Sequence, residues 1–451
     1  MKENRRRQIS RRGFLGGAAG VGAGFLVVPS HVLAGGASAP SDTLNVAGIG
    51  AGGRGGHDVR LVARHANIVA LCDVDSDEAA STYREFPEAK TFTDYRRMLD
   101  EMGDDIDAVT IGIPDHAHFH AAMRAMERGK HVYVEKPLAH SVWEARQLAR
   151  AARKHGVVTQ MGNQGHSTVS TAQIRDWILD GAIGPVHEVR AWIRGSYSMQ
   201  SKPSRAEPPD SLDYDLWLNR AHYRPFSPVF HPGGWRRWHP FGTGKSGDWG
   251  CHQLDPAFYA LDLAEPERVR VDFGGEWPVR NSYPTRFTIT WTYPARGTQP
   301  PLRVRYFLLD NATSVEEAVP RPEHLEPNRS LPGTGTAIIG EKASILHGGH
   351  GGGGHIVPQE KMQEIGQPPR RSPRVGGHHQ SWVQACKGQG QALSSFDYAA
   401  PLAEMVLLGE VALRSESREI EWDSGKMQVT NDRDANRFVR GPEPREGWEL
   451  T

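Results

Sequence analysis

The sequence predicts a doubly wound α/β domain with a parallel sheet, followed by a second domain with strands of its own. Apolar runs of strand length alternate with helical patterns between residues 43 and 162, and a glycine-rich turn directly follows the first run. After residue 164 the pattern changes to a helix and longer alternating segments. We therefore expect residues 42–164 to form one domain and residues 165–451 to contain the other.

Each predicted strand of the first domain is a short apolar run bounded by turn residues. The runs lie at 44–49, 67–72, 107–111, 131–134 and 157–161, and helical patterns lie between them, for example at 117–128 and 141–155. Strands that alternate with helices at this spacing are typical of parallel sheets joined by crossover helices.

The second domain has a more varied pattern. We expect a helix over 170–180, strands over 186–193, 268–273, 286–293 and 302–308, and an amphipathic helical segment over 381–414 that closes this domain or packs on the first. Residues 311–332 are rich in Pro and Glu and predict a loop.

The first 34 residues have the pattern of an export leader. Residues 10–15 spell Ser-Arg-Arg-Gly-Phe-Leu, a twin-arginine motif, and an apolar stretch and a Val-Leu-Ala cleavage site at 32–34 follow. The twin-arginine export machinery carries chains that have already folded. We expect a periplasmic or otherwise exported protein, with no stable membrane insertion after cleavage near Gly35. The alternative is an uncleaved membrane anchor.

Composition excludes several classes of protein. The chain has 53 basic and 53 acidic residues, so no basic excess indicates a nucleic-acid partner. Its three cysteines make no disulfide framework, which fits a chain that folds in the reducing cytoplasm before export.

The glycine-rich turn has the pattern of a dinucleotide-binding fingerprint. Gly50 would permit the tight turn, Gly52 the close approach of a pyrophosphate, and Gly55 the close packing of helix on sheet, with Gly53 and Arg54 beside the phosphates. A second register, Gly48, Gly50 and Gly53, also satisfies the pattern, but Gly48 lies inside the predicted strand.

Asp73 ends the second predicted strand, about 20 residues after the glycines. An acid here would accept hydrogen bonds from the adenosine ribose, and together with Asp75 it would repel a 2′-phosphate. We therefore expect NAD rather than NADP as the cofactor. The alternative is that Asp73 caps a helix.

Two further motifs resemble the Gfo/Idh/MocA family of oxidoreductases: Pro-Asp-His-Ala-His at 114–118 and Glu-Lys-Pro at 135–137. The resemblance implies a Rossmann domain and a C-terminal α+β domain with a large, mostly antiparallel open sheet, whose free face often makes the contact of a homo-oligomer (dimer or tetramer). It implies a cis bond before Pro137, and a Lys136 that contacts cofactor and substrate hydroxyl. The cofactor-binding residues expected besides the glycine turn and Asp73 are Pro114, His116, His118, Glu135, Lys136, Pro137, Asn163 and Gln164.

Lys136 follows a parallel strand, at the edge of the sheet where ligands bind. Burial beside a positively charged nicotinamide should lower the pKa of this lysine and make it a proton acceptor.

A second group of candidate catalytic residues lies at 248–255. Asp248, His252 and Asp255 are four and three residues apart, so they would share one face of a helix. Asp248 and His252 match the Asp-x-x-x-His pattern of the family, in which the histidine acts as acid or base and the aspartate orients it. The alternative is a capped helix in which His252 packs in the core.

Further candidates for binding substrate are His166, Trp235, Arg236 and Trp238. Tryptophan faces beside polar side chains suit a sugar ring, and core packing is the alternative. Histidines at 347, 350 and 355 lie in a glycine-rich run, and His378 and His379 begin a late helix. Their spacing fits no tight zinc pattern, so we expect a loop near the site and no metal.

These patterns lead to one hypothesis about function, with Lys136, Asp248 and His252 as catalytic residues. The protein would be an exported NAD-dependent oxidoreductase acting on a secondary hydroxyl of a sugar or glycoside. Because no NAD pool exists outside the cytoplasm, the cofactor would stay bound and be recycled in the site. One alternative is a redox-neutral glycoside hydrolase or lyase, although the Tyr-Pro-Thr-His signature of one such group is absent. The other is a non-catalytic sugar-binding protein.

Overall fold

The computed structural model describes residues 43–450, and the predicted leader lies outside the described residues. Residues from Leu44 onward form one compact unit. Within residues 43–450, every helix is too short or too polar to cross a membrane.

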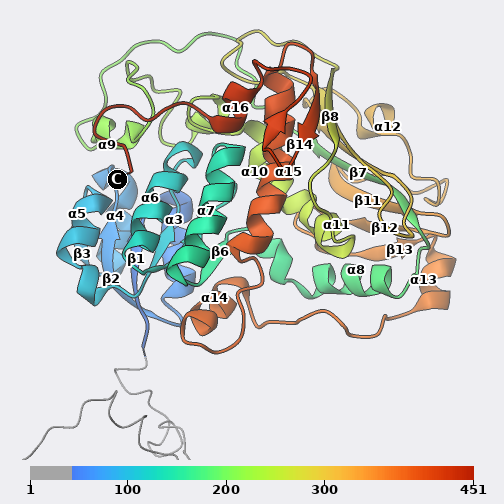
Figure 1. The fold of residues 1–451 in the computed structure, drawn as a ribbon, viewed down its shortest axis with the longest axis horizontal. Coiled ribbons are helices and arrows are strands. Elements are labelled where there is room, and N and C mark those ends of the chain that lie inside the picture. Colours follow the sequence, from blue (N-terminus) through green and yellow to red (C-terminus); the bar gives the residue numbers. More distant parts are fainter. Residues whose placement is uncertain (1–42, 451) are drawn as a thin grey trace, which may run out of the picture. The chain divides into compact units, whose positions relative to one another are not determined.

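The first sheet is parallel, as predicted, and it has six strands where five were expected (Figure 1). Its order is β3-β2-β1-β4-β5-β6, which reverses direction between β1 and β4 and opens a crevice at their carboxyl ends. Within this first sheet, the sequence analysis missed β3, a three-residue edge strand without buried residues. The strands are β1 (Asn45–Ile49), β2 (Asn67–Cys72), β3 (Lys90–Phe92), β4 (Ala108–Ile111), β5 (His131–Val134) and β6 (Thr159–Met161).

Five crossover helices connect these strands, and local sequence sets their ends. In α7, Ser141 and Glu144 form a reciprocal capping box, and Gly156 ends the helix at φ +63°. Such a cap contributes about 1 kcal/mol. The helices are α3 (Gly53–Val62), α4 (Ser76–Glu85), α5 (Tyr95–Glu101), α6 (Asp115–Glu127) and α7 (Val142–His155).

The second sheet is mostly antiparallel, in the order β13-β12-β11-β7-β10-β9-β8-β14-β15, with one parallel pair between β7 and β10. In β9, buried aromatic and aliphatic residues alternate with threonines, so one face is apolar. The strands are β7 (Val186–Arg194), β8 (Arg268–Phe273), β9 (Phe287–Tyr293), β10 (Leu302–Leu309), β11 (Thr334–Gly340), β12 (Ser344–His347), β13 (His355–Val357), β14 (Glu419–Asp423) and β15 (Gln428–Val429).

The apolar face of this sheet packs on helices that also contact the first domain. The central one is α15 (Phe396–Arg414), which lies against α7 and against β8. The predicted helical segment 381–414 is divided into two helices. The first, α14 (His378–Cys386), ends before α15 begins, and it packs on α3. The other helices are α8 (Val169–Leu179), α9 (Tyr214–Leu218), α10 (Gly244–Gln253), α11 (Asp255–Ala260), α12 (Val315–Ala318), α13 (Gln359–Ile365) and α16 (Asn436–Arg440).

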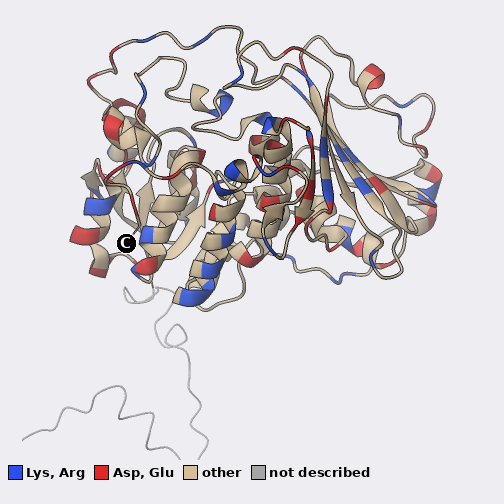
Figure 2. Cartoon of the chain, turned by 45° about the horizontal axis from the view of Figure 1, so that its top comes forward, with Lys and Arg blue, Asp and Glu red and all other residues tan. Residues whose placement is uncertain are grey.

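The opposite face of the sheet has two different surfaces. The segment 311–332 covers one part of it, where Val315, Val319 and Leu325 pack on Trp192 and Phe307. Towards β8 and β14 the strands carry exposed charged pairs, and Figure 2 shows basic and acidic residues along the strands of this sheet. The expected homo-oligomer therefore stays a prediction, and a contact on this face would be largely polar.

Candidate active site

The glycine turn lies at the crevice between β1 and β4. Gly50 has φ +89°, and a Cβ there would lie 2.5 Å from the Gly112 carbonyl oxygen. At Gly55 a Cβ would lie 2.3 Å from the Gly50 oxygen, so the start of α3 packs directly on the turn. These backbone contacts favour the register Gly50, Gly52 and Gly55, while Gly48 lies within β1.

Substitution at Gly55 tests this packing. Gly55→Ala should lower the free energy of unfolding by about 1–3 kcal/mol and weaken NAD binding, because the methyl group meets backbone atoms that cannot move aside. Thermal unfolding and NAD titration measure both effects. Gly53→Ala is the matched control: Gly53 has φ +46° but no atom within 4 Å of its Cβ position, so it adds only about 1 kcal/mol of backbone strain. An equal loss in both variants would contradict the steric argument.

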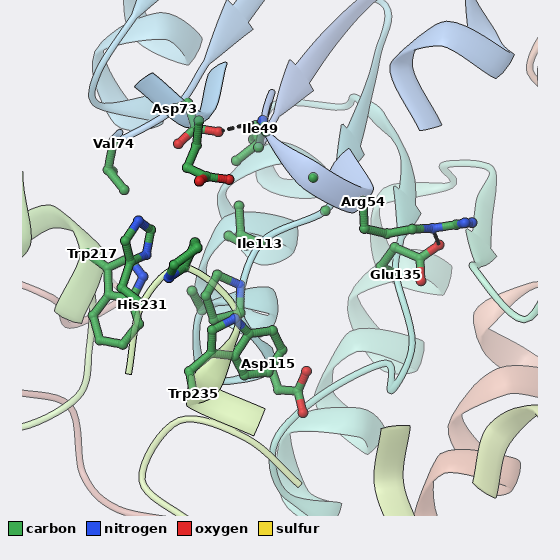
Figure 3. A pocket seen from close by; sticks show the side chains of 18 of the residues that line it. Ile49, Arg54, Asp73, Val74, Ile113, Asp115, Glu135, Trp217, His231 and Trp235 are labelled. Carbon is green, nitrogen blue, oxygen red and sulfur yellow. Dashed lines mark hydrogen bonds and ion pairs between the residues drawn. The ribbon is translucent and has the colours of Figure 1, made fainter. Parts of the chain in front are cut away.

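A cavity of about 300 Å³ extends from the glycine turn to Lys136. One wall comes from the first domain, including Gly52, Asp73 and Ile113, and the other comes from Trp217, His231 and Trp235 of the second domain (Figure 3). Of the predicted site residues, those that line it are Gly50, Gly52, Gly53, Arg54, Asp73, Pro114, Glu135, Lys136, Trp235 and Arg236.

Asp73 holds the glycine turn in place. Its Oδ2 accepts hydrogen bonds from the backbone N–H of Ala51 (2.8 Å) and Gly52 (2.9 Å), and its Oδ1 accepts one from Asp75. Burial raises the pKa of Asp73 although these hydrogen bonds oppose the shift. The residue that caps α4 is Asp75, not Asp73.

Arg54, Glu135 and Gln164 form a connected polar group at the other end of the turn. Arg54 Nε donates to Glu135 Oε1 (3.0 Å), which also accepts from Gln164 Nε2 (2.8 Å). Arg54 also pairs with buried Asp58. These contacts hold the Arg54 guanidinium beside the first turn of α3, where an anion would bind.

Lys136 and Asp248 meet where the two domains join, and the Lys136–Pro137 bond is cis. Lys136 Nζ donates to Asp248 Oδ1 (2.6 Å), and the Tyr197 hydroxyl donates to Asp248 Oδ2 (2.7 Å). Arg236 Nε lies 3.6 Å from the same carboxylate. Two hydrogen-bond donors and one nearby guanidinium thus converge on one buried acid.

The structure corrects the expected pKa of Lys136. Burial alone would lower the pKa of this amine, but the charges of Asp248 and Glu135 and the hydrogen bond to Asp248 outweigh burial and raise it. The pKa of Asp248 is held far below its usual range: burial opposes this, but Lys136 and Arg236 prevail. Lys136 is therefore a cation and Asp248 an anion at neutral pH.

His252 lies one turn beyond Asp248 on α10. Burial, followed by the charge of Lys136, lowers the pKa of His252 well below its ordinary value, so the imidazole is neutral. Its Nδ1 is buried and has no hydrogen-bond partner within residues 43–450. The His350 ring lies 4.4 Å from the His252 ring, which places the glycine-rich loop 347–355 at the site.

Other predicted residues lie behind the cavity wall. His116 contacts the carbonyl oxygens of Phe241 and Trp217, and His118 those of Pro137 and Ile113. Asn163 accepts from the Ser394 hydroxyl. Through these contacts they support the backbone around the site.

Five other predicted residues lie away from the Asp248 cluster. Helix α10 ends before Asp255, which starts α11 and pairs with His166 (3.0 Å). Trp238 lies in an aromatic core. His378 contacts Met161 and Ser167, and His379 contacts Asp58. No group of three or more His, Cys, Asp or Glu side chains in residues 43–450 is placed to hold a metal.

The segment 211–243, which we call the clasp, covers the crevice from the second domain. Its backbone bonds to the first domain at Ser211–Ser76 and Asp213–Val74, and Thr243 donates to Asp115. His231 Nε2 lies 2.7 Å from Asp75 Oδ2. Sequence analysis missed the clasp contacts and Tyr197, since none follows a local motif.

Parallel sheets of this order bind dinucleotides at the point where strand order reverses. With a lysine, a carboxylate and a neutral histidine beside that point, the fold and site define the class of dinucleotide-dependent oxidoreductases. Residues 44–163 match the Gfo/Idh/MocA family model described as an oxidoreductase family with an NAD-binding Rossmann fold, and 176–299 match the model of its C-terminal alpha/beta domain. These matches cover more than half of the chain, and the protein belongs to the Gfo/Idh/MocA family. Its cofactor is NAD.

Relatives named for an enzymatic activity are similar to part of this chain. Levoglucosan dehydrogenase of Pseudarthrobacter phenanthrenivorans is 30% identical over 191 residues, 42% of this chain and 42% of that protein. A glycosyl hydrolase family 109 protein of Saccharopolyspora erythraea is 27% identical over 298 residues, 59% and 58% of the two chains. The solved structure of levoglucosan dehydrogenase with NADH has a TM-score of 0.56 at 18% identity, covering 84% of this chain and 99% of that one. The chain thus spans about half the length, or less, of most curated relatives it matches.

Proposed function

We propose that this protein oxidises a secondary hydroxyl of a sugar or glycoside, with an NAD that stays bound and is recycled in the site. The observation that carries the proposal is the Lys136–Asp248–Tyr197 cluster beside neutral His252. The residues present fit the cofactor. A Cβ at Gly50 or Gly55 would clash with backbone, so both positions of the dinucleotide-binding turn need glycine, and the cavity joins this turn to Lys136. When bound, NAD accepts hydride at its nicotinamide C4.

The pKa values assign different roles to the polar groups. Protonated Lys136 donates a hydrogen bond that orients the substrate hydroxyl, and Asp248 keeps the amine charged and in place. Neutral His252 can take the proton that the substrate hydroxyl loses on oxidation. The histidine is therefore the proton acceptor of the proposal, in place of Lys136.

A panel of sugars and glycosides added to the purified protein tests this function. Bound NAD should be reduced by one class of sugar, seen as the rise of reduced-nicotinamide absorbance, and reoxidised by a second sugar. Redox silence toward every sugar, with NAD bound, would contradict the proposal.

A second candidate is redox-neutral cleavage of a glycoside. The match to a glycosyl hydrolase family 109 protein favours it, because it covers 59% of this chain. In this activity NAD would supply oxidation and later re-reduction of a ring hydroxyl, and the ketone state would acidify the adjacent C–H for elimination. Lys136 would orient the hydroxyl and His252 would take its proton. Release of free aglycone without net change in nicotinamide absorbance would assign this activity.

The clasp supports the retained cofactor. His231→Ala removes the contact between the clasp and Asp75 Oδ2 and should speed NAD release about tenfold, since losing one hydrogen bond to a charged group costs about 1.5 kcal/mol. The measurement is the NAD fraction that remains after rapid gel filtration, against time. The matched control is His222→Ala, an exposed histidine of the same segment. Equal release rates in both variants would contradict the role of the clasp.

Export by the twin-arginine machinery to the periplasm is part of the same proposal, and residues 10–15 support it. Replacing both arginines, Arg11 and Arg12, with lysine should leave the protein in the cytoplasmic fraction. Association into a homo-oligomer is also proposed, and light scattering of the purified protein tests it.

A further inference from the structure

Two cations, Lys245 and Arg237, lie beside the ring of Tyr197, whose hydroxyl donates to Asp248. Lys245 lies in the first turn of α10, three residues before Asp248. Its Nζ lies 5.0 Å from the centre of the Tyr197 ring and 5.2 Å from that of Trp249. Because the N-terminus of a helix carries partial positive charge, this is an unfavourable place for a lysine.

The carboxylate near Lys245 is already engaged. Asp248 takes hydrogen bonds from Lys136 and Tyr197 and lies close to Arg236. No ion pair of Lys245 is formed within residues 43–450. Burial and the charge of Arg237 lower the pKa of Lys245 despite the attraction of Asp248. A half-buried cation without its own anion is an unusual feature.

Arg237 is a second cation beside the same ring, exposed and without an ion pair within residues 43–450. Its guanidinium lies 5.9 Å from the Tyr197 ring centre, and the hydrogen bond found for it in residues 43–450 goes to the Met199 sulfur (3.7 Å). Lys245 and Arg237 thus flank one tyrosine whose hydroxyl reaches Asp248. From Lys245 to Asp248 the helix rises only about 5 Å, so a ligand could touch both.

We infer that the substrate sugar carries an anionic group, a carboxylate or a sulfate ester, which Lys245 and Arg237 bind while a hydroxyl of the sugar reaches Lys136 and His252. The inference rests on the proposed function and adds the substrate class. An anion at this position gives Lys245 an ion-pair partner that residues 43–450 do not supply, and charge-assisted hydrogen bonds of this kind are strong.

The test compares methyl glucuronide, methyl glucoside and methyl glucoside 6-sulfate on the NAD-loaded enzyme. We expect kcat/KM for one acidic sugar to exceed that for the glucoside at least tenfold, and the two acidic arms distinguish carboxylate from sulfate. Lys245→Met should reduce this ratio at least tenfold, mainly through KM, and Lys245→Arg should restore it. Lys361→Met, on exposed α13, is the matched control.

Binding measured by Trp fluorescence keeps the inference independent of turnover. If no sugar is oxidised but an acidic sugar binds the wild type and not Lys245→Met, the proposed function fails and the inference holds. The inference is overturned if the uncharged glucoside is turned over or bound to the same extent as both acidic sugars. It is also overturned if the preference for an acidic sugar persists in a Lys245→Met/Arg237→Gln variant. In both cases the proposed function can stand. If neither acidic sugar binds, the inference is overturned as well.

Discussion

Lys136→Met should lower kcat about a thousandfold while the protein retains its NAD. The amine is the donor that holds Asp248 at 2.6 Å and, in the proposal, orients the reacting hydroxyl. Loss of one preorganised hydrogen-bond donor at the reacting oxygen costs about two to three orders of magnitude in kcat. The measurement is the rate of NAD reduction by the best sugar in single turnover, with NAD content determined on the same sample.

The buried pair complicates this variant, because removing Lys136 takes away the cation that is hydrogen-bonded to Asp248, and Arg236 at 3.6 Å and the neutral Tyr197 hydroxyl offset the remaining charge less well. Such an uncompensated charge destabilises a fold by about 3–5 kcal/mol. The double variant Lys136→Met/Asp248→Asn removes both charges and serves as the folded control, and Lys136→Arg keeps the cation. Near-normal turnover in a folded, NAD-loaded Lys136→Met protein would exclude the catalytic role.

Glu410→Gln should make the protein less sensitive to alkaline pH. Glu410 lies on α15 behind α10, where its carboxyl group contacts the Ser246 hydroxyl. Burial raises the pKa of Glu410 from 4.5 to about 7, although Ser246, Arg414 and Tyr283 oppose the shift. His239 lies 3.9 Å away but is neutral, since burial puts its pKa well below the ordinary value.

The sign of the pH effect follows from proton binding. Between about pH 4.5 and 7 the folded protein keeps a proton on Glu410 that the unfolded chain releases, so stability present below this window is lost as the pH rises through it. The raised pKa corresponds to about 3 kcal/mol. Wild type and Glu410→Gln should therefore differ little at about pH 4 and by about 3 kcal/mol, in favour of the variant, at about pH 8.

Urea unfolding at a series of pH values measures this difference. Glu404→Gln, on the same helix, is the contrasting variant. Glu404 pairs with Arg146 and accepts a hydrogen bond from Trp422, so this substitution should destabilise the protein even in alkaline solution, where Glu410→Gln stabilises it. Parallel pH profiles for wild type and Glu410→Gln would show that Glu410 is ionised in the fold.

The sequence alone determined the elements that depend on local pattern. The parallel strands followed from apolar runs at 44–49, 67–72 and 131–134, and the glycine turn from the spacing of its residues. Lys136 could be singled out because its motif follows a strand end, and Asp248 and His252 because four residues make one helical turn. Each of these signals lies within a few residues of chain.

Only the tertiary structure decided what depends on segments far apart. Asp248 is 112 residues from Lys136 and 51 from Tyr197, and no spacing predicts that they meet. Their meeting reversed the expected pKa shift of Lys136, since a buried amine responds to the charge beside it more than to burial. In the same way, packing placed His166 against Asp255 and brought the clasp over the NAD crevice, because the energies that position these groups arise only when the two domains fold together.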